Sequence, residues 1–233
     1  MTVRPSTWTV VALLLAVVSS RASAQAPTAV PADPDPEYTK VLNERAGDVI
    51  AALKIEGDAD KAARVRETLI AQYRAIRDVH DGRDAKLKSI PKDDKAQVDK
   101  AKADAEAAMR PLHDDFLAKL GKDLTPEQID VVKDKMTMGK VKNDYNAFLD
   151  MLPELTDAQK AHILAQLKEA REIAMDQGSS EAKHAVFGKY RGRINNYLSK
   201  EGYDLKKASK DWADRRKARE AQAKQPPTTK PTN

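Results

Sequence analysis

The segment 58–80, DADKAARVRETLIAQYRAIRDVH, decides the fold class. Its apolar and aromatic side chains recur every three or four residues, which is the spacing of one face of an α-helix. These positions are Ala62, Val65, Leu69, Tyr73, Ile76 and His80. The same spacing and an Ala-, Lys-, Glu-, Asp- and Leu-rich composition continue through 37–221, so we predict an all-α helical bundle of about seven to eight helices.

The first long helix, 58–90, is expected to pair with a second one, 96–120, across the break at Pro91. The second helix is the least hydrophobic segment of this region, and Pro111 is expected to kink or divide it. We therefore predict a projecting helical hairpin, with 96–120 as a solvated arm rather than a core element.

Two later helices begin with similar sequences. Leu-Thr-Pro-Glu-Gln at 124–128 and Leu-Thr-Asp-Ala-Gln at 155–159 each place Thr three residues before Gln. This is the pattern of a capping box. The Thr side chain accepts a hydrogen bond from the backbone N–H of the Gln, and the Gln side chain accepts one from the backbone N–H of the Thr. Both segments are therefore expected to start helices.

The two ends of the chain differ from the helical region. Residues 1–24 combine Arg4, an uncharged apolar run and Ala-Ser-Ala at 22–24, which is typical of a signal peptide cleaved after Ala24. We expect a periplasmic or secreted protein. No later segment is uncharged for the ~20 residues that a membrane span needs. Residues 25–36 and 222–233 are predicted to be a disordered leader and a disordered Pro/Thr-rich tail around a single domain, 37–221.

Charge and composition exclude several classes of function. The net charge of +5 arises at the two ends, since 25–204 is mildly acidic, and we expect no nucleic-acid partner. The chain has no cysteine and no nucleotide-binding or nucleophile motif. His80 with Asp81 and Asp84, and His113 with Asp114 and Asp115, lack the spacing of metal ligands on one helix face. We expect no cofactor and no metal, and we favour a non-enzymatic function while leaving enzymatic activity open.

The segment 183–203, KHAVFGKYRGRINNYLSKEGY, is the strongest candidate binding site. Projected as a helix, it has an apolar face around Phe187 that is bordered by polar side chains. Carbohydrate recognition uses this mixture, because flat rings contact sugar C–H groups while amides and guanidinium groups bind hydroxyls. The predicted ligand residues are His184, Gly188, Tyr190, Arg191, Asn195 and Tyr197.

A structural interpretation of the same segment stays open. Its aromatic side chains are also expected in a protein core, with the polar border making bonds between helices. Gly188 and Gly192, four residues apart, indicate close approach of either a neighbouring helix or a ligand.

The sequence GSSEAKHAVFGKYRGRINNYLSKEGYDLKK at 178–207 resembles a secreted bacterial family of unknown function that is described as sugar-binding. The resemblance covers most of 37–207. It implies a carbohydrate or a cell-envelope glycan as the partner, and it assigns no ligand residue.

Two alternative functions follow from weaker signals. The Leu-Thr-x-x-Gln segments resemble a motif of periplasmic helical chaperones and envelope-stress sensors. An accessory enzyme of polysaccharide breakdown, using His184 and Arg191, is the second alternative.

Overall fold

The computed structural model describes residues 35–223. In this part the chain forms eight α-helices and no strands, in agreement with the predicted all-α bundle. The helices are α1 (Pro36–Leu53), α2 (Ala59–Ser89), α3 (Lys95–Leu120), α4 (Pro126–Met136), α5 (Lys140–Met151), α6 (Asp157–Met175), α7 (Ser180–Lys200) and α8 (Leu205–Ala223).

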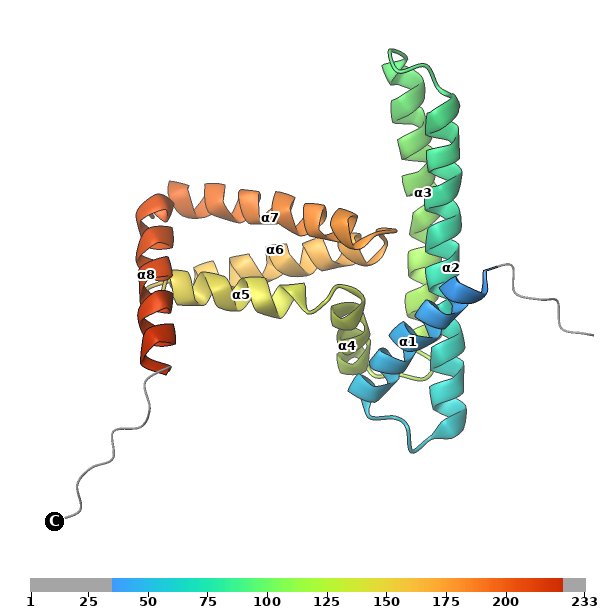
Figure 1. Cartoon of the computed structure of the whole chain (residues 1–233), viewed down its shortest axis with the longest axis horizontal. Helices are drawn as coiled ribbons and strands as arrows, with labels where there is room; N and C mark the ends of the chain where they lie inside the picture. The colour runs from blue at the N-terminus through green and yellow to red at the C-terminus, as the bar shows by residue number, and fades with distance from the viewer. Residues whose placement is uncertain (1–34, 224–233) are drawn as a thin grey trace, which may run out of the picture. The chain divides into compact units, whose positions relative to one another are not determined.

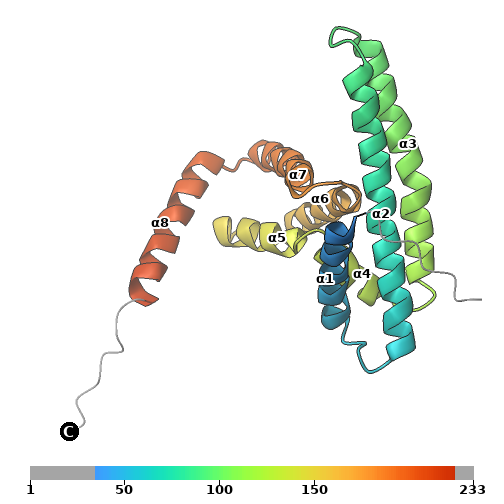
Figure 2. The same ribbon diagram turned by 45° about the vertical axis from the view of Figure 1, so that its right-hand side comes forward.

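The predicted hairpin is present. Helices α2 and α3 lie side by side in both views (Figure 1 and Figure 2). The N-terminus of α2 is capped by Asp58, whose side chain accepts from the backbone N–H of Lys61 at 3.0 Å. Helix α3 begins in the same way, because Asp94 accepts from the backbone N–H of Gln97 at 3.0 Å.

The expected division of α3 and its expected place outside the core are both wrong. The helix continues through Pro111 without division, and its second half belongs to the core, since Met109, Phe116 and Leu120 are buried. Pro111 itself is exposed, so water can satisfy the carbonyl that the missing N–H leaves unpaired.

The buried side chains form two clusters. The first joins α1, α2, α3 and α4 and includes Leu42, Leu69, Phe116 and Val132. The second joins α5, α6 and α7, where Phe148, Ile163, Leu167, Phe187, Ile194 and Leu198 pack together. Met175, at the end of α6, packs in the first cluster, whereas the other buried apolar side chains of α6 pack in the second.

The turns into α5 and α8 depend on glycine. Gly139, between α4 and α5, has φ +62°, and Gly202, before α8, has φ +95°. Residues with a side chain rarely adopt this left-handed conformation. After Gly202, the side chain of Asp204 accepts from the backbone N–H of Lys207 at 3.0 Å and starts α8. Helix α8 then packs against α5 and α7.

The predictions for the chain ends fall largely outside the described residues. The structure does not describe the predicted signal peptide at 1–24, most of the leader or most of the tail. Among the described residues, the first helix begins at Pro36 and the last ends at Ala223. No helix of 35–223 is both long enough and apolar enough to span a membrane.

Candidate functional site

The polar border predicted on α7 is an exposed strip rather than a pocket. His184 and Asn195 are exposed, and Arg191 is half-buried. The guanidinium Nη1 of Arg191 donates to Asp144 Oδ2 on α5 at 2.9 Å, and Lys140 Nζ lies 3.0 Å from Asp144 Oδ1. The charge of Arg191 is therefore already matched by an acid of the neighbouring helix.

Both tyrosines predicted to bind a ligand are engaged by the protein. Tyr190 is 3% exposed, and its hydroxyl donates to Glu169 Oε1 at 2.6 Å. Burial, and then the bond to Glu169, raise the pKa of Tyr190. Tyr197 is half-buried and packs against His162, with ring centroids 4.0 Å apart. The core interpretation thus holds for Tyr190, while part of Tyr197 remains accessible.

The two glycines of α7 are not contact points between helices. A Cβ at Gly188 would find Arg191 Nη2 of its own helix nearest, at 3.8 Å, and a Cβ at Gly192 would meet nothing within 4 Å. The expectation of a closely approaching helix at these positions is therefore wrong.

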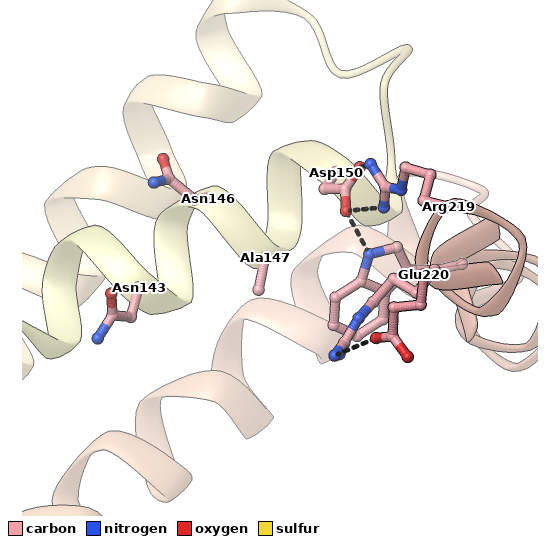
Figure 3. Close-up of a pocket in the computed structure, with 8 residues that line it drawn as sticks. Asn143, Asn146, Ala147, Asp150, Arg219 and Glu220 are labelled. Carbon is pink, nitrogen blue, oxygen red and sulfur yellow. Dashed lines mark hydrogen bonds and ion pairs between the residues drawn. The ribbon is translucent and has the colours of Figure 1, made fainter. Parts of the chain in front are cut away.

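A pocket of about 390 Å³ lies between α5 and α8 (Figure 3), and none of its lining residues belongs to the predicted border. Helix α5 contributes two amides and an acid, and α8 contributes an indole and charged groups. The lining residues are Asn143, Asn146, Ala147, Asp150, Trp212, Arg216, Arg219 and Glu220.

Asp150 fixes α8 against α5. Figure 3 shows this carboxylate next to Arg219. Trp212 Nε1 donates to Asp150 Oδ2 at 2.7 Å, and Arg219 donates to both oxygens at 3.1 and 2.6 Å. The bonds from Arg219, and then that from Trp212, lower the pKa of Asp150 to about 2. The acid is therefore ionised at neutral pH, and the indole is held in one orientation.

The other pocket-lining side chains are less constrained. Neither Asn143 nor Asn146 makes a side-chain hydrogen bond to another residue of 35–223 that we identify, and both are exposed. The guanidinium of Arg216 lies over the Trp212 ring, 5.2 Å from its centroid, and 3.7 Å from Glu220. The pocket thus offers amide donors and acceptors that a ligand can use without breaking a bond of the fold.

A second polar cluster surrounds the end of α6. His113 Nδ1 lies 2.8 Å from Asp176 Oδ2, and His80 Nε2 lies 2.8 Å from the Asp176 carbonyl oxygen. Lys133 Nζ donates to Glu172 Oε2 at 2.7 Å, and Lys183 Nζ donates to the carbonyl of Met136 at 2.8 Å. Burial lowers the pKa of Lys183 to about 8.

This cluster connects helices. The two histidines considered as metal ligands bind Asp176 instead, and across 35–223 no three His, Asp or Glu side chains gather in a way that could hold a metal ion. Arg171, 4% exposed, contributes further ion pairs to Asp130 at 2.6 Å and Asp134 at 2.8 Å on α4. These bonds join α6 to α2, α3 and α4.

Sequence reasoning missed the α5–α8 pocket. A tryptophan in the highly charged helix 205–223, and two asparagines within the four residues Asn143–Asn146, were the available signals. Neither signal says that the two helices meet, because Trp212 and Asp150 are 62 residues apart.

A family model described as "Protein of unknown function (DUF3826)" matches residues 39–218. No curated protein matches the chain. The match extends over all of α2 to α7 and most of α1 and α8, and its description names no ligand. The predicted resemblance to a family of unknown function is confirmed: the chain belongs to the DUF3826 family.

Proposed function

We propose that the chain is a non-enzymatic carbohydrate-binding protein and that the α5–α8 pocket holds the sugar. One observation carries the proposal: an indole, two unbonded planar amides and a guanidinium–carboxylate pair line the same pocket of about 390 Å³. This volume lies within the range of small-molecule sites, ~300–1,000 Å³. An aromatic ring and planar hydrogen-bonding groups are also the features for which the α7 border was predicted to bind sugar.

The energetics favour ligand binding at this pocket. Trp212 is held by Asp150 before any ligand arrives, so little side-chain freedom is lost on binding. Arg216 covers the indole, but its ion pair with Glu220 is exposed and long, and such pairs contribute about 0–1 kcal/mol. A sugar ring can therefore replace Arg216 on the indole at small cost.

The α7 border remains an alternative binding surface. The two surfaces share no residue: Asp144 on α5 binds Arg191, whereas Asn143, Asn146 and Asp150 on the same helix line the pocket. Variants on the two surfaces can therefore be tested separately.

The test is calorimetry and thermal denaturation with a panel of plant and bacterial glycans. Ligand at ~100 times its dissociation constant should raise the unfolding free energy by about 2.7 kcal/mol. The double variant Asn143→Ala/Asn146→Ala should fold normally, because both side chains are exposed, and should bind at least about tenfold more weakly, a loss of ~1.4 kcal/mol.

The matched control is His184→Ala/Asn195→Ala, which changes two exposed residues of the α7 border and should leave the affinity unchanged. If the control loses affinity while the α5 variant keeps it, the α7 border is the site. If no glycan stabilises the wild-type protein at millimolar concentration, carbohydrate binding is refuted.

The chaperone alternative is less favoured. The Thr and Gln side chains of both Leu-Thr-x-x-Gln segments form capping boxes, so helix initiation accounts for these residues. The accessory-enzyme alternative relies on His184 and Arg191, neither of which lines the α5–α8 pocket, and Arg191 is already bound to Asp144. Export through the signal peptide at 1–24 is part of our proposal, and those residues lie outside the described range.

A further inference from the structure

We infer that the ligand of the α5–α8 site is an acidic oligosaccharide of at least two sugar units, with a carboxylate or sulfate against Arg215. This inference rests on the proposed carbohydrate-binding function and specifies its ligand class. It follows from a second pocket beside the first and from the balance of charges across the two.

The second pocket, of about 450 Å³, adjoins the first. It is lined by Leu149, Asp150, Pro153, Arg215, Ala218, Arg219 and Gln222. Asp150 and Arg219 line both pockets, so their doubly hydrogen-bonded pair forms a shared wall. Two adjoining pockets along one helix pair are arranged like neighbouring subsites of a binding site. A ligand that fills both pockets must be longer than a single sugar ring.

The two pockets differ in chemistry. The first has the indole and the amides, while the second has the apolar side chains of Leu149, Pro153 and Ala218 together with Gln222 and Arg215. A sugar unit in the second pocket would lie on an aliphatic surface, with hydrogen bonds available from one amide and one guanidinium group.

The charges of the first pocket are balanced. Asp150 is matched by Arg219, and Glu220 lies 3.7 Å from Arg216. Arg215 differs from these residues. Its Nη2 donates to the carbonyl oxygens of Asp150 at 2.8 Å and Met151 at 3.2 Å, and within 35–223 it forms no ion pair that we identify with a carboxylate. The second pocket therefore has an excess of positive charge.

The carbonyls that Arg215 binds lie at the C-terminal end of α5. A helix C-terminus has a partial negative charge of roughly half an electron, which offsets only part of the guanidinium charge. The bonds use one nitrogen of Arg215, and a guanidinium group has five N–H donors arranged in a planar fork. The remaining donors can bind a carboxylate or a sulfate by charge-assisted hydrogen bonds, which are about twice as strong as neutral ones.

The experiment compares acidic glycans with their neutral counterparts by calorimetry. The probes are trigalacturonic acid and its methyl ester, and a sulfated chondroitin tetrasaccharide and its desulfated form, so that carboxylate and sulfate are tested separately. We expect at least one acidic probe to bind the wild-type protein about tenfold more tightly than its neutral partner, with a preference that weakens as salt is raised.

Arg215→Gln should abolish this preference, so that the acidic probe binds no more tightly than its neutral partner. The matched control is Lys217→Gln, which removes the same charge from an exposed position of α8 that lines neither pocket, and it should keep the preference.

The inference is overturned if neither acidic probe binds more tightly than its neutral partner, or if Arg215→Gln and Lys217→Gln behave alike. In those cases binding of the neutral probes would still support the proposed function. If none of the four probes binds, the acidic-ligand inference fails, and the broader glycan panel decides the proposed function independently.

Discussion

At the scale of single residues, the charge of His113 depends on a carboxylate partner. Its Nδ1 lies 2.8 Å from Asp176 Oδ2, and its Nε2 lies 3.7 Å from Glu172 Oε2. The hydrogen bond to Asp176 raises the pKa of His113 above its ordinary value, although burial acts in the opposite direction. The protonated imidazole is therefore more favourable in the folded protein than in the unfolded chain.

This raised pKa predicts how stability depends on pH. Below the unfolded-state pKa of about 6.5, His113 is protonated in both states and its full stabilisation is present. As the pH rises through the higher folded-state pKa, the proton and the stabilisation are lost, so the contribution of His113 to the unfolding free energy should decrease. Lys183, whose pKa is lowered to about 8, acts in the opposite direction above that pH, so the His113 contribution is read as the difference between the wild type and His113→Gln. Urea denaturation between pH 6 and pH 9 measures this decrease.

His113→Gln should remove this part of the pH dependence. His184→Gln is the control, because it deletes an exposed imidazole on α7 and should leave the slope as in the wild type. An unchanged slope in His113→Gln would show that other groups cause the pH dependence.

At the scale of helices, the two capping boxes make a direct prediction. Thr125 accepts from the backbone N–H of Gln128, and Thr156 accepts from that of Gln159, each at 3.3 Å. Thr125→Ala and Thr156→Ala should each lower the unfolding free energy by about 1 kcal/mol. The double variant should lose about the sum, because the two boxes share no partner.

Serine at either position supplies the same acceptor oxygen and should retain most of the stability. The midpoint of urea denaturation is the measurement. Equal losses for Ser and Ala would mean that the side-chain hydrogen bond is not the cause.

Features determined within a few residues could be predicted from the sequence. Helix starts at Asp58, Thr125 and Thr156 were expected, and each side chain accepts from a backbone N–H three residues later. Capping is local, so the pattern contains the necessary information.

Features that depend on tertiary packing could not be predicted in this way. Pro111 was expected to disrupt the helix, but the burial of Met109, Phe116 and Leu120 on either side favours one continuous helix. The α5–α8 pocket depends on the contact of Trp212 with Asp150, and no periodicity in either helix encodes that pairing.

At the scale of the molecule, polar bonds at the end of α6 link the two hydrophobic clusters. Asp176 binds His80 on α2 and His113 on α3, and Lys183 on α7 donates to the Met136 carbonyl at the end of α4. One carboxylate oxygen of Asp176 is buried without an identified partner. Close packing of the loop after α6 against α2 is therefore needed to keep these bonds.

Gly178 makes this close packing possible. A Cβ at this position would lie 2.9 Å from His80 Cδ2 and 3.2 Å from His80 Cγ, and the bond to the Asp176 carbonyl restrains the imidazole. Gly178→Ala should therefore lower the unfolding free energy by about 1–3 kcal/mol, the usual cost of overpacking.

Gly192→Ala is the matched control, because a Cβ there meets nothing within 4 Å, and it should stabilise the exposed helix α7 by up to about 1 kcal/mol. The double variant Gly178→Ala/His80→Ala tests the cause. Removing the imidazole relieves the clash, so Gly178→Ala should cost much less in the His80→Ala background than in the wild type. If Gly178→Ala costs the same in both backgrounds, contact with His80 is not what requires glycine, and α2 and the α6–α7 loop are joined by other means.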